Sequence, residues 1–197
     1  MGAYQMRLMT LIGAAFTAAV IAGSAGAVPV TCPVSPTPDE RVFTLDTTPG
    51  STCLGHGTGN ISGNPADDPI FGLLPNLVLI DKSDNGGGAL DGALVATAGS
   101  LTGGLSGSFS FSAPGFTNFV IGFKSGFGRI IPVWAAFLLP AGVFSGDWSI
   151  SGTQALSHAN LYGVQGPTPI PLPGAAILLI GGLGALGALA ARRKKPA

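Results

Sequence analysis

The chain has 197 residues, of which 32 are glycine, 16 are proline and two are cysteine, and its formal net charge is zero. Only 9% of its residues are charged, against roughly a quarter in an ordinary soluble domain. This composition argues against nucleic-acid binding, because no basic patch is present to neutralise phosphates, and against a long coiled coil or an ordinary helical cytosolic enzyme.

The N-terminal segment has the composition of a secretory signal peptide. Residues 8–23 form an apolar run of 16 residues behind one positive charge, Arg7, and the small residues Ala-Gly-Ala follow at 25–27. The run is short for a membrane span, whereas the small residues are typical of a cleavage site. The sequence predicts a signal peptide over 1–27 that is cut after Ala27, and an uncleaved N-terminal anchor is the alternative.

One exported domain is predicted over residues 28–163. Its first part, 28–75, holds eight prolines and is expected to be loop-rich, with one short strand at 41–46. Its second part, 76–163, holds 11 of the 15 aromatic residues of the chain and is expected to supply the core strands. Residues 28–173 contain nine acidic and four basic side chains, so this part of the chain has a net charge of about −5.

Apolar and polar residues alternate with a period of two in the second part of the domain. In residues 106–112, for example, Phe109 and Phe111 alternate with serines. Such segments, bounded by Gly, Pro, Asn and Ser about every ten residues, are typical of an antiparallel β-sandwich. The sequence therefore predicts an all-β fold, an antiparallel β-sandwich of jelly-roll-like type. The strands expected in this part lie at 77–80, 93–98, 106–112, 118–124, 133–139, 147–151 and 155–163.

Cys32 and Cys53 are the only cysteines, and they enclose 20 residues of the exported part. In an oxidising compartment such a pair is expected to form a disulfide, worth about 3 kcal/mol by loop-closure entropy. A metal site would need further ligands, and His56 is the only candidate nearby. The sequence therefore predicts the disulfide, with metal binding as the alternative.

The C-terminal region combines a proline-rich stalk, an apolar helix and a basic tail. In residues 164–173 proline occupies every second position from Pro167 onward, which favours an extended polyproline II conformation. Residues 174–191 carry no charge, and 18 residues of helix span about 27 Å, enough for a bilayer core. The basic residues that follow favour a cytoplasmic end for the helix, with the domain outside. Together, 174–197 are predicted to form a transmembrane helix with a stop-transfer tail, and a buried core helix is the alternative. The tail consists of Arg192, Arg193, Lys194 and Lys195.

This C-terminal region resembles a PEP-CTERM sorting signal, and more closely its VPLPA-type variant. The motif in this chain is Pro169-Ile170-Pro171-Leu172-Pro173-Gly174, with isoleucine for the family's valine and glycine for its final alanine. The segments 147–150 (Asp-Trp-Ser-Ile) and 156–163 (Leu-Ser-His-Ala-Asn-Leu-Tyr-Gly) are similar to strands found in many such exported proteins. The resemblance covers about residues 76–197 and the signal peptide, whereas 28–75 match no pattern of the family.

The resemblance implies sorting rather than catalysis. It implies that the chain is exported and that an exosortase, a membrane protease-transpeptidase, recognises the proline motif and removes the helix. The expected function is that of a non-enzymatic cell-surface or extracellular-matrix protein associated with exopolysaccharide or biofilm. Its expected partners are an exosortase, the membrane through residues 174–191 and, through the exported domain, exopolysaccharide. No nucleic-acid partner is expected.

Catalytic motifs are missing from the sequence: it has no nucleophile elbow, Walker loop, HExxH or CxxC pair. A secreted hydrolase is therefore only the third hypothesis, after the surface protein and the carbohydrate-binding module. His56 lies between glycines and is expected to be a surface histidine in a flexible loop. His158 alternates with Leu156, Asn160 and Tyr162, so these side chains are expected on one side of a strand, with His158 as a hydrogen-bonded structural histidine.

A glycine-rich segment with several carboxylates, residues 81–91, is the best candidate for a cation site. Asp81, Asp84 and Asp91 could supply oxygen ligands to Ca²⁺, although the spacing is not that of an EF-hand. A solvated turn between two strands is the alternative. No other cofactor is expected.

Three large aromatic residues, Trp134, Trp148 and Tyr162, are candidates for stacking against a sugar. The alternative function is accordingly a carbohydrate-binding β-sandwich module that the C-terminal segment tethers to the membrane or the surface. The alternative interpretation of these residues is that they build the core of a sandwich that is poor in leucine and isoleucine.

Overall fold

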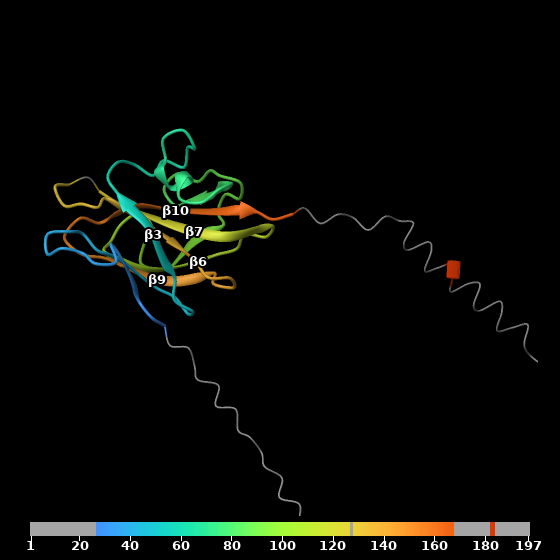
Figure 1. Ribbon diagram of the computed structural model, residues 1–197, viewed down its shortest axis with the longest axis horizontal. Helices are drawn as coiled ribbons and strands as arrows, with labels where there is room; N and C mark the ends of the chain where they lie inside the picture. The colour runs from blue at the N-terminus through green and yellow to red at the C-terminus, as the bar shows by residue number, and fades with distance from the viewer. Residues whose placement is uncertain (1–26, 127, 168–181, 184–197) are drawn as a thin grey trace, which may run out of the picture.

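A computed structural model describes residues 27–126, 128–167 and 182–183 of the chain. Within these ranges the chain forms ten β-strands and one short 3-10 helix. The strands belong to two five-stranded antiparallel sheets that pack face to face as a sandwich (Figure 1). The predicted all-β sandwich is confirmed, whereas the predicted signal peptide and transmembrane helix lie outside the described residues.

The first sheet has the strand order β1-β2-β9-β6-β5. In that order the strands are Val30–Cys32, Phe43–Asp46, Ser145–Ile150, Ser106–Phe111 and Leu94–Ala98. The second sheet has the order β3-β8-β7-β10-β4. Its strands are Thr52–Gly57, Trp134–Leu138, Phe116–Ser125, Leu156–Gln165 and Leu77–Lys82.

The main hydrophobic core lies between the two sheets. On β6, Phe109 and Phe111 are buried, as their alternation with serine predicts. Phe123 of β7 and Trp148 of β9 meet across this core with ring centroids 5.6 Å apart. The first sheet leaves its serine-bearing face outward, so its strands keep the alternating pattern of a half-buried sheet.

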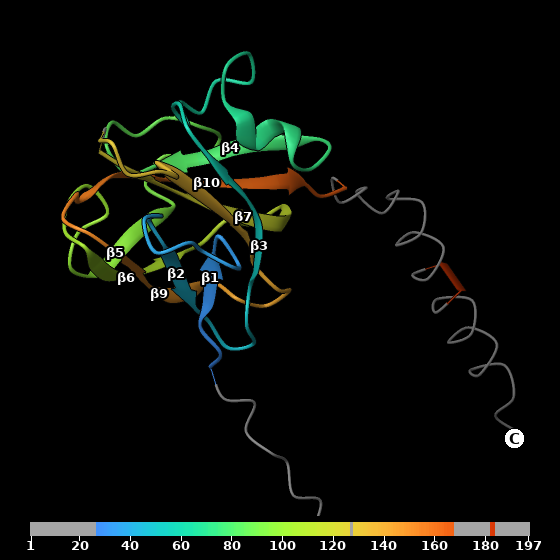
Figure 2. The ribbon, with the colours of Figure 1, turned by 60° about the vertical axis from the view of Figure 1, so that its left-hand side comes forward.

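A second hydrophobic cluster covers the outer face of the second sheet. It lies between this sheet and the segment 58–76, which includes the 3-10 helix η1 (Pro69–Gly72), and Figure 2 shows this segment lying against β4 and β10. Asp68 begins η1 by accepting a hydrogen bond from the amide of Ile70. Because β7, β8 and β10 are buried on both faces, they contain nearly continuous runs of buried residues. We call the segment 58–76 the cover.

The first part of the domain is more regular than the sequence predicts. Besides β2, which the sequence located, residues 28–75 contribute β1 and β3. Both are edge strands, pairing on one side only. In β3, glycines stand where larger side chains approach: a Cβ on Gly57 would lie 3.0 Å from the Trp134 ring. Glycine has low strand propensity, so this strand carries no clear sequence signal.

The predicted disulfide between Cys32 and Cys53 is present. It connects β1 of the first sheet to β3 of the second, so it joins the two layers at one edge of the sandwich. The structure thereby confirms the disulfide and not the metal-site alternative for these two residues.

The last strand, β10, contains a bulge that changes which side chains share a face. The register shifts between Leu156 and His158, so Leu156 joins the core between the sheets together with Ala159 and Leu161. The prediction that Leu156 lies on the same side as His158, Asn160 and Tyr162 is wrong for this reason. The strand also continues to Gln165, two residues past its expected end.

Candidate functional site

The three aromatic side chains considered for sugar stacking are all buried. Trp148, only 3% exposed, lies between the sheets, whereas Trp134 (5%) and Tyr162 (0%) lie beneath the cover. The indole N–H of Trp134 donates a hydrogen bond to the Thr58 carbonyl. These residues belong to the hydrophobic core, as the alternative interpretation of them predicts, and do not form an exposed platform.

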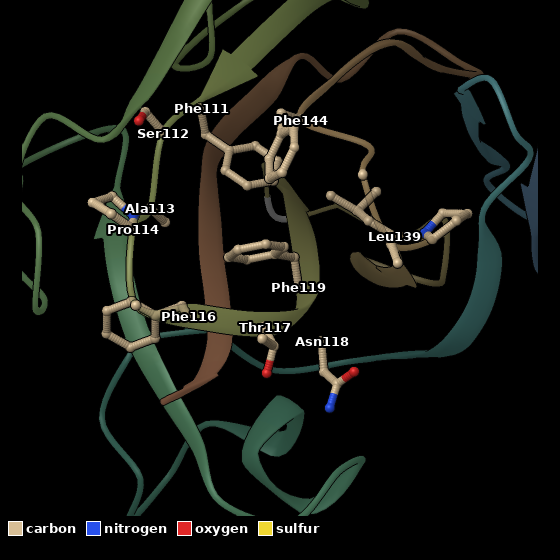
Figure 3. A pocket seen from close by; sticks show the side chains of 14 residues that line it. Phe111, Ser112, Ala113, Pro114, Phe116, Thr117, Asn118, Phe119, Leu139 and Phe144 are labelled. Carbon is tan, nitrogen blue, oxygen red and sulfur yellow. The ribbon is translucent and has the colours of Figure 1, made fainter. Parts of the chain in front are cut away.

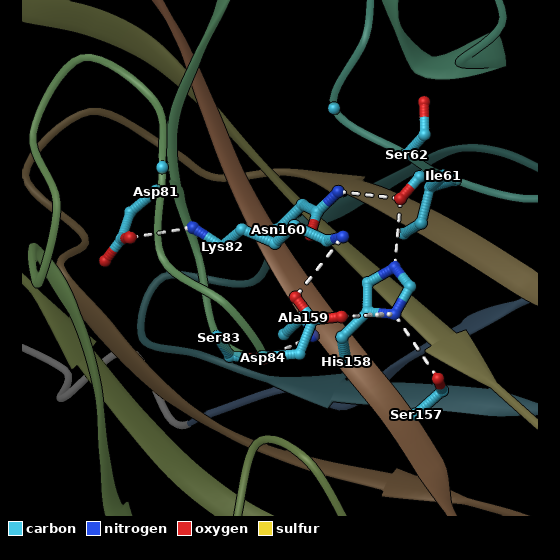
Figure 4. A network of polar contacts seen from close by, with 12 residues as sticks. Ile61, Ser62, Asp81, Lys82, Ser83, Asp84, Ser157, His158, Ala159 and Asn160 are labelled. Carbon is cyan, nitrogen blue, oxygen red and sulfur yellow. Dashed lines mark hydrogen bonds and ion pairs between the residues drawn. The ribbon is translucent and has the colours of Figure 1, made fainter.

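Polar side chains of β10 attach the cover to the sheet (Figure 4). The Tyr162 hydroxyl donates to Asp68 at 2.6 Å and accepts from the side-chain amide of Asn160 at 2.8 Å. The same amide donates to the Ile61 carbonyl at 2.9 Å, and His158 Nε2 lies 2.9 Å from that carbonyl. Burial, followed by the nearby Asp68 charge, raises the pKa of Tyr162 well above its ordinary value. These contacts give the network a structural role.

His158 is the buried, hydrogen-bonded histidine that the sequence predicts. Its Nδ1 lies 3.3 Å from the Ser157 hydroxyl and 3.6 Å from Asp84. Desolvation by burial lowers the pKa of His158; Lys82 and Lys124 act in the same direction, while the hydrogen bond to Ile61 and the charge of Asp84 oppose it. His56, by contrast, is exposed, although it lies on β3 and not in the flexible loop that was expected.

The carboxylates of the candidate calcium loop do not converge. Asp81 is buried and accepts hydrogen bonds from the amides of Lys82 and Leu94, both at 2.7 Å. Asp84 pairs with Lys82 at 3.3 Å, and Asp91 accepts from the Gly87 amide at 3.3 Å. Among the described residues, no group of three or more His, Cys, Asp or Glu is placed to hold a metal ion. The carboxylates instead stabilise the loop internally.

An aromatic cleft lies at one end of the sandwich, where the chain crosses between the sheets (Figure 3). The turn after β6, residues 112–115, and the connection from β8 to β9, residues 139–144, form its walls. The cleft has a volume of about 740 Å³. Backbone hydrogen bonds hold the walls: the Phe111 amide donates to the Phe144 carbonyl, and the Leu139 amide to the Phe119 carbonyl, each at 2.9 Å. The cleft is therefore framed by the sheets themselves.

Three phenylalanine rings meet inside this cleft. The ring centroids of Phe111 and Phe119 are 4.8 Å apart, and the Phe144 ring lies 5.6 Å from the first and 5.9 Å from the second. Phe111 and Phe119 are nearly buried, whereas Phe144 is 48% exposed. Edge-to-face packing of this kind fixes ring orientation. The exposed Phe144 thus presents a positioned aromatic surface to solvent.

Neutral polar residues are among those that line the cleft. Figure 3 shows the Thr117 and Asn118 side chains directed away from the three rings, below Phe119. Asn118 has φ of 51°, the left-handed region that asparagine tolerates better than most residues. None of the described residues that line the cleft is charged.

A second, smaller hollow of about 290 Å³ adjoins the aromatic cleft, and Gly142 and Phe144 line both. Its polar wall contains Asp46 of β2 and Asp147 of β9, which face each other directly in the antiparallel pairing. Asp147 accepts a hydrogen bond from the Ser108 hydroxyl. Within the described part of the chain, the buried Oδ1 of Asp46 has no hydrogen-bond partner. Phe144 therefore separates an aromatic surface from a pair of carboxylates.

Sequence reasoning did not find this site. The rings come from strands and loops far apart in the chain, and the two carboxylates meet only through the β2–β9 register. Phe144, which lies two residues from both Gly142 and Gly146, was a local signal, because a large aromatic residue in a glycine-containing connection has no apolar repeat around it to place it in a core.

The sorting motif Pro169–Gly174 and the basic tail 192–195 lie outside the described residues. In the portion that the structure does describe, no helix has both the length and the apolar character needed to cross a bilayer. Comparison with protein-family models, with curated proteins and with solved structures found no match.

Proposed function

We propose that the chain is an exported, non-enzymatic cell-surface or extracellular-matrix protein with a PEP-CTERM-like sorting signal at its C-terminus. An exosortase-type membrane protease would recognise residues 169–174, the helix 174–191 would hold the chain in the membrane, and the basic tail 192–195 would set its orientation. The exported domain would then lie at the surface or in an exopolysaccharide matrix.

The disulfide is the structural observation that carries this proposal. Stable disulfides form mainly in oxidising compartments outside the cytosol, and Cys32–Cys53 joins the two layers of the domain. This agrees with the signal-peptide pattern of residues 1–27.

Five of the chain connections between consecutive strands cross between the sheets, which supports a jelly-roll-like classification.

Mass spectrometry of the protein recovered from the cell surface and from the medium tests the proposal. The expected chain begins at Val28 and ends near Pro173. Recovery of an intact chain that still carries residues 192–197 would contradict sorting cleavage and would indicate a permanent single-span membrane protein.

Variants of the motif make this test specific. Replacing Pro171 and Pro173 with alanine should leave the chain unprocessed in the membrane fraction. Pro167→Ala, in the same stalk but before the motif, is the matched control and should be processed normally. Truncation before Arg192 should misroute or release the protein. Normal surface display of both the motif variant and the truncated chain would refute the proposed signal.

A further inference from the structure

The aromatic cleft and the carboxylate hollow offer two kinds of contact on either side of one exposed ring. Phe144 is 48% exposed and is held by Phe111 and Phe119. Across it lie Asp46 and Asp147, whose carboxylate oxygens accept hydrogen bonds. A ligand that fits both sides needs an apolar face and, at its edge, several hydrogen-bond donors.

We propose that this site, defined by Phe111, Phe119, Phe144, Asp46 and Asp147, binds a neutral oligosaccharide. A pyranose ring has a face of C–H groups, which packs on an aromatic ring, and an edge of hydroxyls, which donate to carboxylates. The site is distinct from the buried residues Trp134, Trp148 and Tyr162. The proposal rests on the proposed function only for the source of the glycan, because binding itself is a property of the folded domain.

The charges at the site select against acidic glycans. Among the described residues lining the two hollows, none is Lys, Arg or His. In the full chain, in which Ala27 also lines the smaller hollow, a uronic acid would therefore bring its carboxylate towards Asp46 and Asp147 without a cation to offset the repulsion. These two carboxylates already face each other across β2 and β9, an arrangement that is unfavourable for like charges. Hydroxyl donors from a neutral sugar would relieve it.

The apolar lining alone does not specify a sugar. The carboxylates favour a sugar over a purely apolar ligand, because they require hydrogen-bond donors. An acyl chain would cover the phenylalanine rings but would bring no hydrogen-bond donor to the exposed carboxylate of Asp147. A polyhydroxylated ligand satisfies both walls. The rigid backbone frame around Phe111, Leu139 and Phe144 means that little ordering is needed on binding.

Saturation-transfer difference NMR and calorimetry on the full chain test the proposal, in a zwitterionic detergent without a sugar headgroup. The probes are neutral tetrasaccharides of glucose, mannose and galactose, with alginate tetrasaccharide as the acidic comparison. We expect at least one neutral probe to bind, with transfer strongest to its ring C–H protons, and alginate to bind at least tenfold more weakly. Absence of binding by every neutral probe, or equal binding of alginate, would overturn the proposal.

Variants locate the binding site. Phe144→Ala should weaken binding about tenfold, the usual scale for losing an aromatic contact, and Phe144→Leu should weaken it similarly because it keeps bulk but removes the ring face. Asp147→Asn should weaken binding severalfold. Val95→Ala, on β5, is the matched control, since Val95 is 46% exposed and does not line either hollow. Binding unchanged by both Phe144 variants would exclude this site.

The two proposals fail separately. Normal processing and surface display with no binding of the neutral probes would refute the glycan site and leave the sorting proposal intact. Binding of a neutral probe, together with a failure of export and processing in cells, would refute the sorting proposal and leave the glycan site intact.

Discussion

The hydroxyl of Tyr162 is a small group with a large structural role, because it joins the sheet to its cover. It lies in a fully buried side chain and connects Asp68, at the start of η1, to Asn160 of β10. Asp68 also accepts from the amides of Gly63 and Ile70, so one carboxylate organises the turn and η1. The cover is thereby held by polar bonds as well as by apolar packing.

Removing this hydroxyl should destabilise the domain. We expect Tyr162→Phe to lower the free energy of unfolding by about 1.5–3 kcal/mol, the range for a buried hydrogen bond to a charged group. Ser100→Ala removes an exposed hydroxyl that contacts Thr102 and should change stability by less than about 0.5 kcal/mol. Urea unfolding of both variants provides the measurement, and equal effects would contradict the role assigned to Tyr162.

The second residue-scale prediction concerns acid stability and His158. Burial lowers the pKa of His158 below its ordinary value of 6.5, so between these two pKa values the unfolded chain binds a proton that the folded chain does not. Stability should therefore fall as the pH decreases below about 6.5, with a slope of at most about 1.4 kcal/mol per pH unit, and level off below the folded pKa.

His158→Gln should remove this contribution, even though it lowers stability at neutral pH by disturbing the contact to Ile61. His56→Gln, which changes the exposed histidine of β3, is the matched control and should keep the slope. Urea unfolding between pH 5 and pH 8 measures it. An unchanged slope in His158→Gln would show that other groups cause the acid sensitivity.

At the scale of elements, the contact of the cover with the second sheet depends on Gly122 of β7. A Cβ at this position would lie 2.5 Å from Ile70 Cδ1 and 3.1 Å from Ile61 Cδ1. Both isoleucines are fully buried, so neither can move without disturbing its neighbours. Glycine at this point is therefore a requirement of close packing rather than of backbone conformation.

Gly122→Ala should lower the free energy of unfolding by about 1–3 kcal/mol through overpacking. Gly72→Ala is the control, because a Cβ there would meet no atom within 4 Å and the residue does not have a positive φ. It should be neutral or slightly stabilising. Thermal unfolding distinguishes the two variants. Equal stability would mean that the cover can shift to accommodate the added methyl group at little cost.

The predictability of these elements from sequence depends on what each one packs against. Strands such as β6 and β9 were predictable because one face is buried and the other exposed, which gives a period of two. The cover was not predictable, because its isoleucines, Ile61 and Ile70, occur in a glycine- and proline-rich stretch without period. β3 also lacks a period in its sequence. Its glycines are needed because the Trp134 side chain of another strand packs against them, and this contact cannot be read from the local sequence.

The candidate functional site was even harder to predict from the sequence than these elements. The disulfide followed from counting cysteines, whereas the meeting of Phe111, Phe119 and Phe144 depends on two crossings between sheets. The pairing of Asp46 with Asp147 depends on strand order and register, which no local pattern specifies. The aromatic residues that stood out in the sequence, Trp134 and Trp148, proved to be core: Trp148 lies between the sheets and Trp134 lies under the cover.

At the scale of the whole molecule, the two hydrophobic clusters share the second sheet and should unfold together. Each contains one tryptophan: Trp148 lies in the core between the sheets and Trp134 lies under the cover. The single-tryptophan variants Trp134→Phe and Trp148→Phe therefore report on different clusters. Fluorescence and circular dichroism should give one unfolding midpoint within each variant. A fluorescence midpoint well below the circular dichroism midpoint in Trp148→Phe alone would show that the cover detaches first.

The disulfide between the sheets also determines how the molecule would respond to a pulling force. Cys32 and Cys53 are 21 positions apart, and that length of chain, fully extended, would measure about 70 Å. Because the bond closes the segment into a covalent ring, stretching from the two ends cannot release this length. Single-molecule extension should therefore be about 70 Å shorter with the disulfide intact than after its reduction, which limits how far the domain can elongate under shear.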